Sequence, residues 1–149
     1  DCINNDRFWL KYATDINRNS KNSMDVIDLA FRTGRAAISS NVLPLRDEQI
    51  QIIREELELV CGAIAIHYIN GAIENIGDDA IRNHELSEAK AFIMSLPYGE
   101  NTMVSLADAN SLQSTIGDNF YNVTTASLID ARSQLASYLG ISSADAESL

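Results

Sequence analysis

The sequence has few of the residues that interrupt helices. Only two prolines and seven glycines occur among 149 residues, and the alternation of β-branched with polar side chains that marks a strand is missing. Because turns depend on proline and glycine and strands on alternation, helix is the expected structure for most of the chain. A length of 149 residues with 46% hydrophobic side chains predicts a single helical domain, 1–149, with one core.

Basic residues are also scarce. Eleven lysines and arginines stand against 21 acidic residues, which gives a formal net charge of -10. The chain therefore offers no basic stripe to a phosphate backbone, and we expect no nucleic-acid partner. The longest charge-free apolar run, 59–73, is shorter than the roughly 20 residues that cross a bilayer. We expect a buried helix there and no membrane span.

Cysteine is nearly absent, and the start of the chain lacks a leader. Cys2 and Cys61 are too few for a disulfide framework, and the apolar neighbours of Cys61 favour a buried thiol over a bridge to Cys2. No secretory signal precedes residue 1, and the chain opens with Asp1 rather than Met. The sequence therefore predicts a processed or excised part of a longer protein, with a segment missing upstream.

Apolar periodicity and turn residues predict an all-α helical bundle of about six helices with a long central helical hairpin. The central helix, expected over 46–76, repeats apolar residues at a three-then-four spacing from Ile50 to Ile64. Residues 77–79 end it and begin the next helix, so the two should pair antiparallel. The other expected features are helices over 6–18, 23–39 capped by Ser23, 79–96, 106–116 and 124–139, a turn over 41–45 containing Pro44, and a frayed tail after Gly140.

Two of the expected helices carry apolar residues whose place matters for assembly. Phe8, Trp9 and Tyr12 on the first helix are expected in the core, with a patch that faces a partner as the alternative. The second helix has an apolar stripe that we also expect to face the core. That stripe consists of Val26, Ala30, Phe31, Gly34, Ala37 and Ile38.

Two histidines interrupt the apolar faces of the predicted hairpin. His67 continues the seam of the central helix, and His84 lies four residues before Glu88 on one face of the following helix. An antiparallel hairpin would bring both histidines to one pocket. Because buried polar groups need partners, we expect an internal network in which Arg35 pairs with Glu88. The predicted members of this structural polar cluster are Arg32, Arg35, His67, Asn70, His84, Ser87 and Glu88.

A metal site is the functional alternative for the same residues. His84 and Glu88, with His67 as a third ligand, form a usable set for zinc or iron. The string 84–88 also begins like a zinc-protease motif, but it ends in Glu where the second His is required. The structural network explains these residues without a ligand, and the sequence singles out no catalytic residue.

Four strings of residues resemble a known family when they are taken in order and spacing. They are AFRTGRAAI at 30–38, IREELE at 53–58, IHYIN at 66–70, and HELSE at 84–88 followed by Phe92. Together they resemble the carboxy-terminal half of a family of uncharacterised exported bacterial lipoproteins, typical of Bacteroidota and marine bacteria. That family is a domain of unknown function, and the resemblance covers residues 25–139.

The resemblance implies a helical fold and an envelope location, that is, the periplasm, the outer membrane surface or the extracellular side. It also implies a distant similarity to imelysin-like proteins, helical-bundle lipoproteins associated with iron uptake. This chain departs from the imelysin pattern, because Asn83 stands where that pattern has the Gly before the histidine and Ser87 stands where it has a glutamate.

These observations predict a non-enzymatic module of the cell envelope that binds a partner or ligand, or that assembles. Two alternatives stay open. One is an imelysin-like metal-binding protein in iron uptake, which would use His84, Glu88 and His67. The other is a hydrolase or peptidase, for which a convincing nucleophile is lacking. Because an incomplete bundle exposes an apolar face, we expect self-association or pairing with the missing upstream segment.

Overall fold

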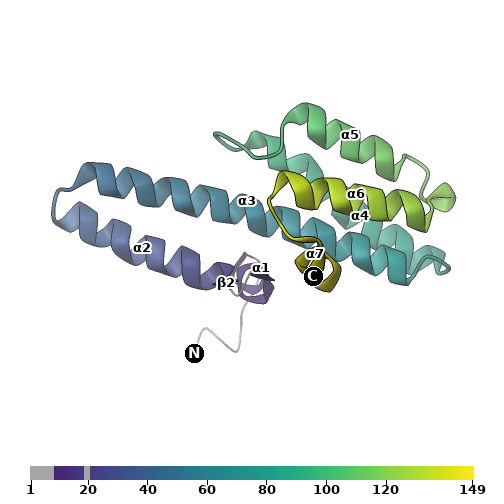
Figure 1. The fold of residues 1–149 in the computed structure, drawn as a ribbon, viewed down its shortest axis with the longest axis horizontal. Coiled ribbons are helices and arrows are strands. Elements are labelled where there is room, and N and C mark those ends of the chain that lie inside the picture. The colour runs from purple at the N-terminus through teal and green to yellow at the C-terminus, as the bar shows by residue number, and fades with distance from the viewer. Residues whose placement is uncertain (1–8, 19–20) are drawn as a thin grey trace. The chain divides into compact units, whose positions relative to one another are not determined.

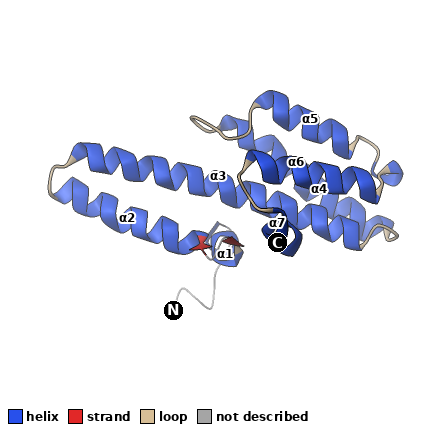
Figure 2. Ribbon diagram, viewed as in Figure 1, coloured by secondary structure: helices blue, strands red, loops and turns tan. Residues whose placement is uncertain are grey.

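The computed structural model describes residues 9–18 and 21–149, and these residues are mostly helical (Figures 1 and 2). The predicted fold class, an all-α helical bundle, is confirmed. The elements are α1 (Trp9–Asp15), β1 (Asn17–Arg18), β2 (Lys21–Asn22), α2 (Ser23–Ser39), α3 (Leu43–Glu74), α4 (Asp79–Ser95), the 3-10 helix η2 (Leu96–Tyr98), α5 (Leu106–Ile116), the 3-10 helix η3 (Phe120–Asn122), α6 (Thr125–Tyr138) and α7 (Ser143–Ser148).

The long helix α3 contributes to two compact units. The first unit extends to Val60 and the second comprises Cys61–Leu149, so their boundary falls within α3. An 18-residue window of this 32-residue helix has a mean hydropathy of 1.2, which by length and composition alone would allow it to cross a membrane. However, 56% of that window is buried. A core helix of a soluble protein has the same properties.

In the first unit, α2 and the first half of α3 form an antiparallel hairpin (Figure 1). Asn41 makes the turn with a φ of 55°, in the left-handed region that asparagine tolerates better than most residues. The N–H of Val42 donates to the oxygen of Ala37 at 2.8 Å, and the N–H of Asn41 donates to that of Ile38 at 3.1 Å. These two bonds are the Schellman pattern, which satisfies the last carbonyls of α2.

Two helix boundaries of this hairpin differ from the predictions, namely the start of α3 after the turn and the N-terminal cap of α2. The expected turn over 41–45 is too long, because α3 already begins at Leu43 and Pro44 lies in its first turn. Proline is tolerated there, since its missing N–H would have no partner within the helix. The cap of α2 is Asn22, whose side chain accepts from the N–H of Met24 at 3.0 Å, and the expected cap Ser23 is buried instead.

The short helix α1 leads into a two-residue antiparallel ladder. Asn17 pairs with Asn22, and the Asn22 side chain donates to the oxygen of Thr14 at 2.8 Å. The helix expected over 6–18 therefore ends early, at Asp15. The prediction that Trp9 is in the core is wrong, because 49% of its surface is exposed. Tyr12 is half-buried, and Phe8 lies outside the described residues.

The second unit contains the predicted pairing of the central helix with the next one. A Cβ at Gly71 of α3 would lie 2.9 Å from the Glu85 carboxylate of α4, and the rings of Tyr68 and Phe92 stack with centroids 5.9 Å apart. These contacts confirm an antiparallel α3–α4 hairpin. The core of the second unit also takes residues from α5 and α6. Its fully buried side chains include Ile66, Ile69, Leu86, Ile93, Leu112, Leu128 and Leu135.

Side-chain caps fix α5 and α6 close to their predicted bounds. Ser105 and Thr124 each form a capping box with the residue three positions later, Asp108 and Ser127. The Ser105 hydroxyl and, to a smaller extent, the Tyr138 hydroxyl donate to Asp108 and lower the pKa of its carboxyl group. Partial burial, followed by the nearby Asp108 charge, raises the pKa of Tyr138. This pair joins the start of α5 to the end of α6.

The C-terminal residues are ordered, so the prediction of a frayed tail after Gly140 is wrong. Gly140 has a φ of 65°, and the N–H of Ile141 donates to the oxygen of Ala136 at 2.9 Å, so the chain reverses at the end of α6. The helix α7 follows and buries Ala146.

The packing of Gly62 yields a stability prediction. A Cβ at this position of α3 would overlap the side chain of Leu139, whereas a Cβ at Gly77 would meet nothing within 4 Å. We expect Gly62→Val to lower the free energy of unfolding by about 1–3 kcal/mol, because the core must shift to admit the side chain. The control Gly77→Val should change it by less than about 0.5 kcal/mol. Urea denaturation measures both, and equal effects would contradict the packing described.

Candidate functional site

The structure does not bury the polar cluster that the sequence predicts. His67, His84 and Ser87 are exposed, and Glu88 is half-buried. The prediction that His67 continues the apolar seam of α3 is wrong, because Ile66 and Ile69 fill the core and turn the neighbouring His67 outward. The two histidines therefore do not share a buried pocket.

The two arginines of the predicted cluster lie on α2 in the first unit. Both are exposed, so their predicted role as buried cations is wrong. Arg32 forms an ion pair with Asp28, one helical turn earlier, at 2.7 Å. The predicted pairing of Arg35 with Glu88 would join residues of different units and stays a prediction.

Asn70 is the member of the predicted cluster that is buried, but its partners differ from those expected. Its amide group donates to the backbone oxygens of Ala146 at 2.8 Å and Leu149 at 3.1 Å. Its carbonyl oxygen accepts from Arg132 at 3.0 Å, and Arg132 also contacts Glu147 at 3.2 Å. This network fastens α7 to α3 and α6 and has a structural role.

The metal hypothesis finds no ligand set in the part of the chain that the structure describes. Residues 9–18 and 21–149 contain no group of three or more His, Cys, Asp or Glu side chains that could hold a metal ion. The structure therefore gives no support to a zinc or iron site at His84, Glu88 and His67.

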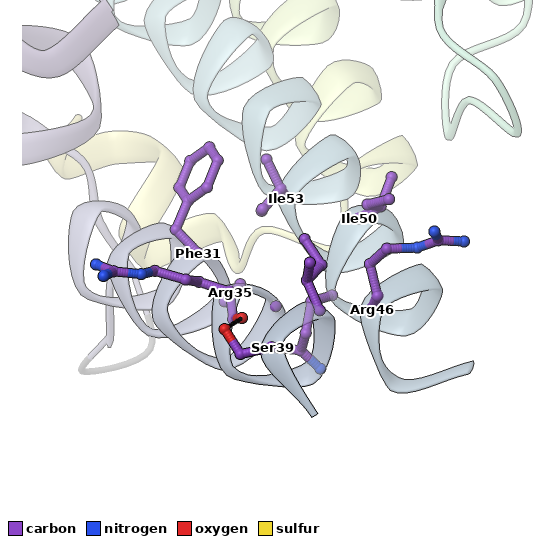
Figure 3. A pocket seen from close by; sticks show the side chains of 10 residues that line it. Phe31, Arg35, Ser39, Arg46, Ile50 and Ile53 are labelled. Carbon is purple, nitrogen blue, oxygen red and sulfur yellow. Dashed lines mark hydrogen bonds between the residues drawn. The ribbon is translucent and has the colours of Figure 1, made fainter. Parts of the chain in front are cut away.

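A groove in the first unit gathers apolar side chains at the surface (Figure 3). It runs along the α2–α3 hairpin and has a volume of about 330 Å³. Helix α2 contributes residues from Ala30 to Ser39, and α3 contributes residues from Arg46 to Ile53. The lining residues that determine its apolar character are Phe31, Gly34, Ile38, Ile50 and Ile53. We call this feature the α2–α3 groove.

The groove exists because the apolar stripe of α2 consists of two rows. Ala30 and Ala37 are buried, whereas 60% of Phe31 and 61% of Ile38 are exposed. Between them, Gly34 lies close to α3, since a Cβ there would be 3.4 Å from the Cβ of Gln49. Small side chains thus face the partner helix and large ones stay outside. The prediction that the whole stripe faces the core is wrong for Phe31 and Ile38.

Two arginines border the apolar lining. Figure 3 shows that Arg35 and Arg46 extend away from it in different directions. Arg46 donates to the Asp47 carboxylate at 2.8 and 2.6 Å. Among the described residues, the Arg35 guanidinium has no ion-pair or hydrogen-bond partner. The α2–α3 groove therefore combines an apolar floor with an arginine at each margin, of which Arg46 is paired with Asp47.

Comparison with known proteins gives a family for this chain. Residues 2–141 match the profile of a domain of unknown function, DUF4856. The chain belongs to this family. No curated protein and no solved structure matches it significantly. The resemblance to a domain of unknown function is therefore confirmed, and the match extends beyond the expected residues 25–139 at both ends.

Sequence reasoning on this DUF4856 chain missed the contribution of α3 to the groove. Ile50 belongs to the predicted core seam, yet 40% of its surface is exposed, and the polar Gln49 is buried in its place. Arg46 received no role. The signal that could have revealed the groove is the width of the α2 stripe, because two adjacent apolar rows exceed what a single partner helix covers.

The network around Asn70 yields a second stability prediction. We expect Asn70→Ala to lower the free energy of unfolding by about 1–3 kcal/mol, because the carbonyls of Ala146 and Leu149 lose their donor. Hydrogen exchange of the α7 amides should become faster. The control Asn75→Ala removes a bond only to the oxygen of Gly71, one turn earlier, and should leave α7 unchanged. Unchanged protection of α7 in Asn70→Ala would show that Asn70 does not fasten this helix.

Proposed function

We propose that this DUF4856 chain is a non-enzymatic helical module that binds a partner helix in the α2–α3 groove. The observation that carries the proposal is the exposure of Phe31 and Ile38, which line the groove and are 60% and 61% accessible. Apolar side chains that gather at a surface, rather than scatter singly, are typical of interaction sites.

The energy available at the groove supports binding. Complete burial of a Phe or Ile side chain contributes about 1.5–3 kcal/mol. Phe31, Ile38 and Ile50 are 60%, 61% and 40% exposed, so a partner that covers them gains roughly half of this amount for each. Because helices α2 and α3 already carry these side chains, little of the gain is lost to the ordering of the site. Three such anchors in one groove resemble the cluster of apolar residues that dominates many interfaces.

The shape and charge of the groove indicate the chemistry of the partner. A furrow between two antiparallel helices accepts the apolar face of a third helix, with anchors spaced three or four residues apart. Arg35 and Arg46 border the lining, and they favour a partner helix with acidic residues beside its apolar face.

The place of action that we propose is the cell envelope, with a lipoprotein of that compartment as the parent protein. The support is the resemblance of the strings at 30–38, 53–58, 66–70 and 84–88 to exported bacterial lipoproteins. The same resemblance supports a distant relation to imelysin-like proteins.

Selection from a displayed library of amphipathic helical peptides tests the function of the groove. We expect the chain to enrich acidic peptides that bind wild type at least about tenfold more tightly than Ile50→Asp, because the substitution places a charge on the apolar floor. The control is Ile129→Asp on α6, which changes an isoleucine of equal exposure, 41% against 40%, outside the groove. Equal binding to all three proteins, or no enriched peptide, would overturn the proposal.

Fractionation of cells that make the natural protein tests the proposed location. An antibody against this chain should detect the parent protein in the membrane or periplasmic fraction, or in the medium. Detection with cytoplasmic marker enzymes alone would contradict an envelope location and would leave the groove function to be judged by the peptide selection.

A further inference from the structure

We propose that the occupant of the α2–α3 groove is a second copy of this chain. We call the turn at 40–42 the tip of the hairpin and the end near residues 25 and 58 its base. The two hairpins would lie antiparallel, with the tip of each beside the base of the other. This inference rests on the proposed function of the groove and names its partner. It follows from the layer structure of the hairpin, the distribution of its charges and the position of Phe31.

A helical hairpin is a single layer, and a single layer cannot bury both of its faces. Helical domains are stable when one layer packs on another. In the first unit, α2 and α3 bury Ala30 and Ala37 between them but leave Phe31, Ile38 and Ile50 outside. A second hairpin laid on this face would complete a four-helix bundle, which is the most economical cover for such a layer.

The charges of α2 are separated along its length. Asp25 and Asp28 lie in its first half, and Arg32 and Arg35 lie in its second half. Two copies of α2 that run in the same direction would bring arginine beside arginine. Two antiparallel copies bring Arg35 of one protomer beside Asp28 of the partner subunit, which is favourable.

The hairpin taken as a whole shows the same separation, with a more basic tip and an acidic base. Between residues 32 and 48 the hairpin carries three arginines and two carboxylates, whereas 23–31 and 49–60 together carry five carboxylates and one arginine. An antiparallel pair places each tip beside the opposite base. Like-charge contacts at both ends disfavour the parallel pair.

Phe31 fixes the register of the pair. It is the middle residue of α2, which runs from Ser23 to Ser39, and it belongs to the lining of the groove. In a twofold-symmetric dimer, residue i contacts residue j of the partner and j contacts i, so the residue on the axis meets its own copy. An axis at Phe31 sets the two Phe31 rings together and keeps the acidic and basic halves of α2 opposite each other.

A matched pair of substitutions tests the interface by sedimentation velocity. The molecular mass obtained for the wild type should be twice the chain mass of 16.4 kDa. Phe31→Asp should be monomeric, and Leu29→Asp should remain dimeric, because both residues are 60% exposed but Leu29 lies outside the groove lining. A monomeric wild type at about 100 µM, where even a weak specific dimer assembles, would overturn the inference. A dimer that survives Phe31→Asp would overturn it as well.

A charge exchange tests the antiparallel arrangement. Arg35→Glu places a second carboxylate beside Asp28 of the partner subunit, and Asp28→Arg places two arginines together, so each variant alone should dimerise at least about tenfold more weakly. A mixture of the two variants restores opposite charges at both symmetric contacts and should form heterodimers. Circular dichroism checks that each variant is folded. Failure of the mixture to dimerise, when wild type does, would overturn the antiparallel pairing.

The mass of the wild type and its binding of the selected peptides together separate the dimer from the groove function. A monomeric wild type that still binds selected peptides in the groove would mean that the partner is another protein. A monomeric wild type that binds no peptide would overturn both. If both hold, the selected peptides should compete with dimerisation, because the two ligands share Phe31 and Ile50.

Discussion

The close packing of α2 against α3 at Gly34 is the constraint on which the first unit depends. A Cβ added at Gly34 would lie 3.4 Å from the Cβ of Gln49 on α3, at van der Waals distance. The small side chains of Ala30 and Ala37 also keep the two helices near each other. Helices this close have no room between them for Phe31 or Ile38. The tight hairpin therefore has an apolar groove on its outer face, and this groove results directly from the internal packing.

The second unit has the opposite arrangement, because it holds a polar group in its core. Asn70 is buried, and its amide is satisfied by two carbonyls near the C-terminus and by Arg132. A buried amide without partners would be costly, so the position of α7 and the presence of Asn70 require each other. One unit thus leaves apolar groups outside for lack of space, whereas the other holds a polar group inside by directed bonds. The groove of the first unit is the apolar surface that a partner would stabilise.

The helices could be predicted from the sequence, because their signals are local. The bounds of α5 follow from Ser105 and Gly117, and those of α6 follow from Thr124 and Gly140. The faces could not be predicted as well. Adjacent residues on a helix differ in direction by about 100°, so extending the seam to His67, next to the buried Ile66, is enough to place the polar cluster wrongly. The partners of Asn70 lie more than 60 positions away in the sequence, beyond the reach of any local pattern.

The acidity of the chain restricts how copies of it can meet. A formal charge of -10 repels a second copy from most directions. Apolar burial at the groove acts over contact distances only, so it can hold a dimer but cannot choose its orientation. The arginines of the hairpin tip supply that choice, because one arrangement alone sets them beside the carboxylates of another hairpin base. Because basic residues are scarce, the position of each arginine on the hairpin determines the specificity of the proposed pair.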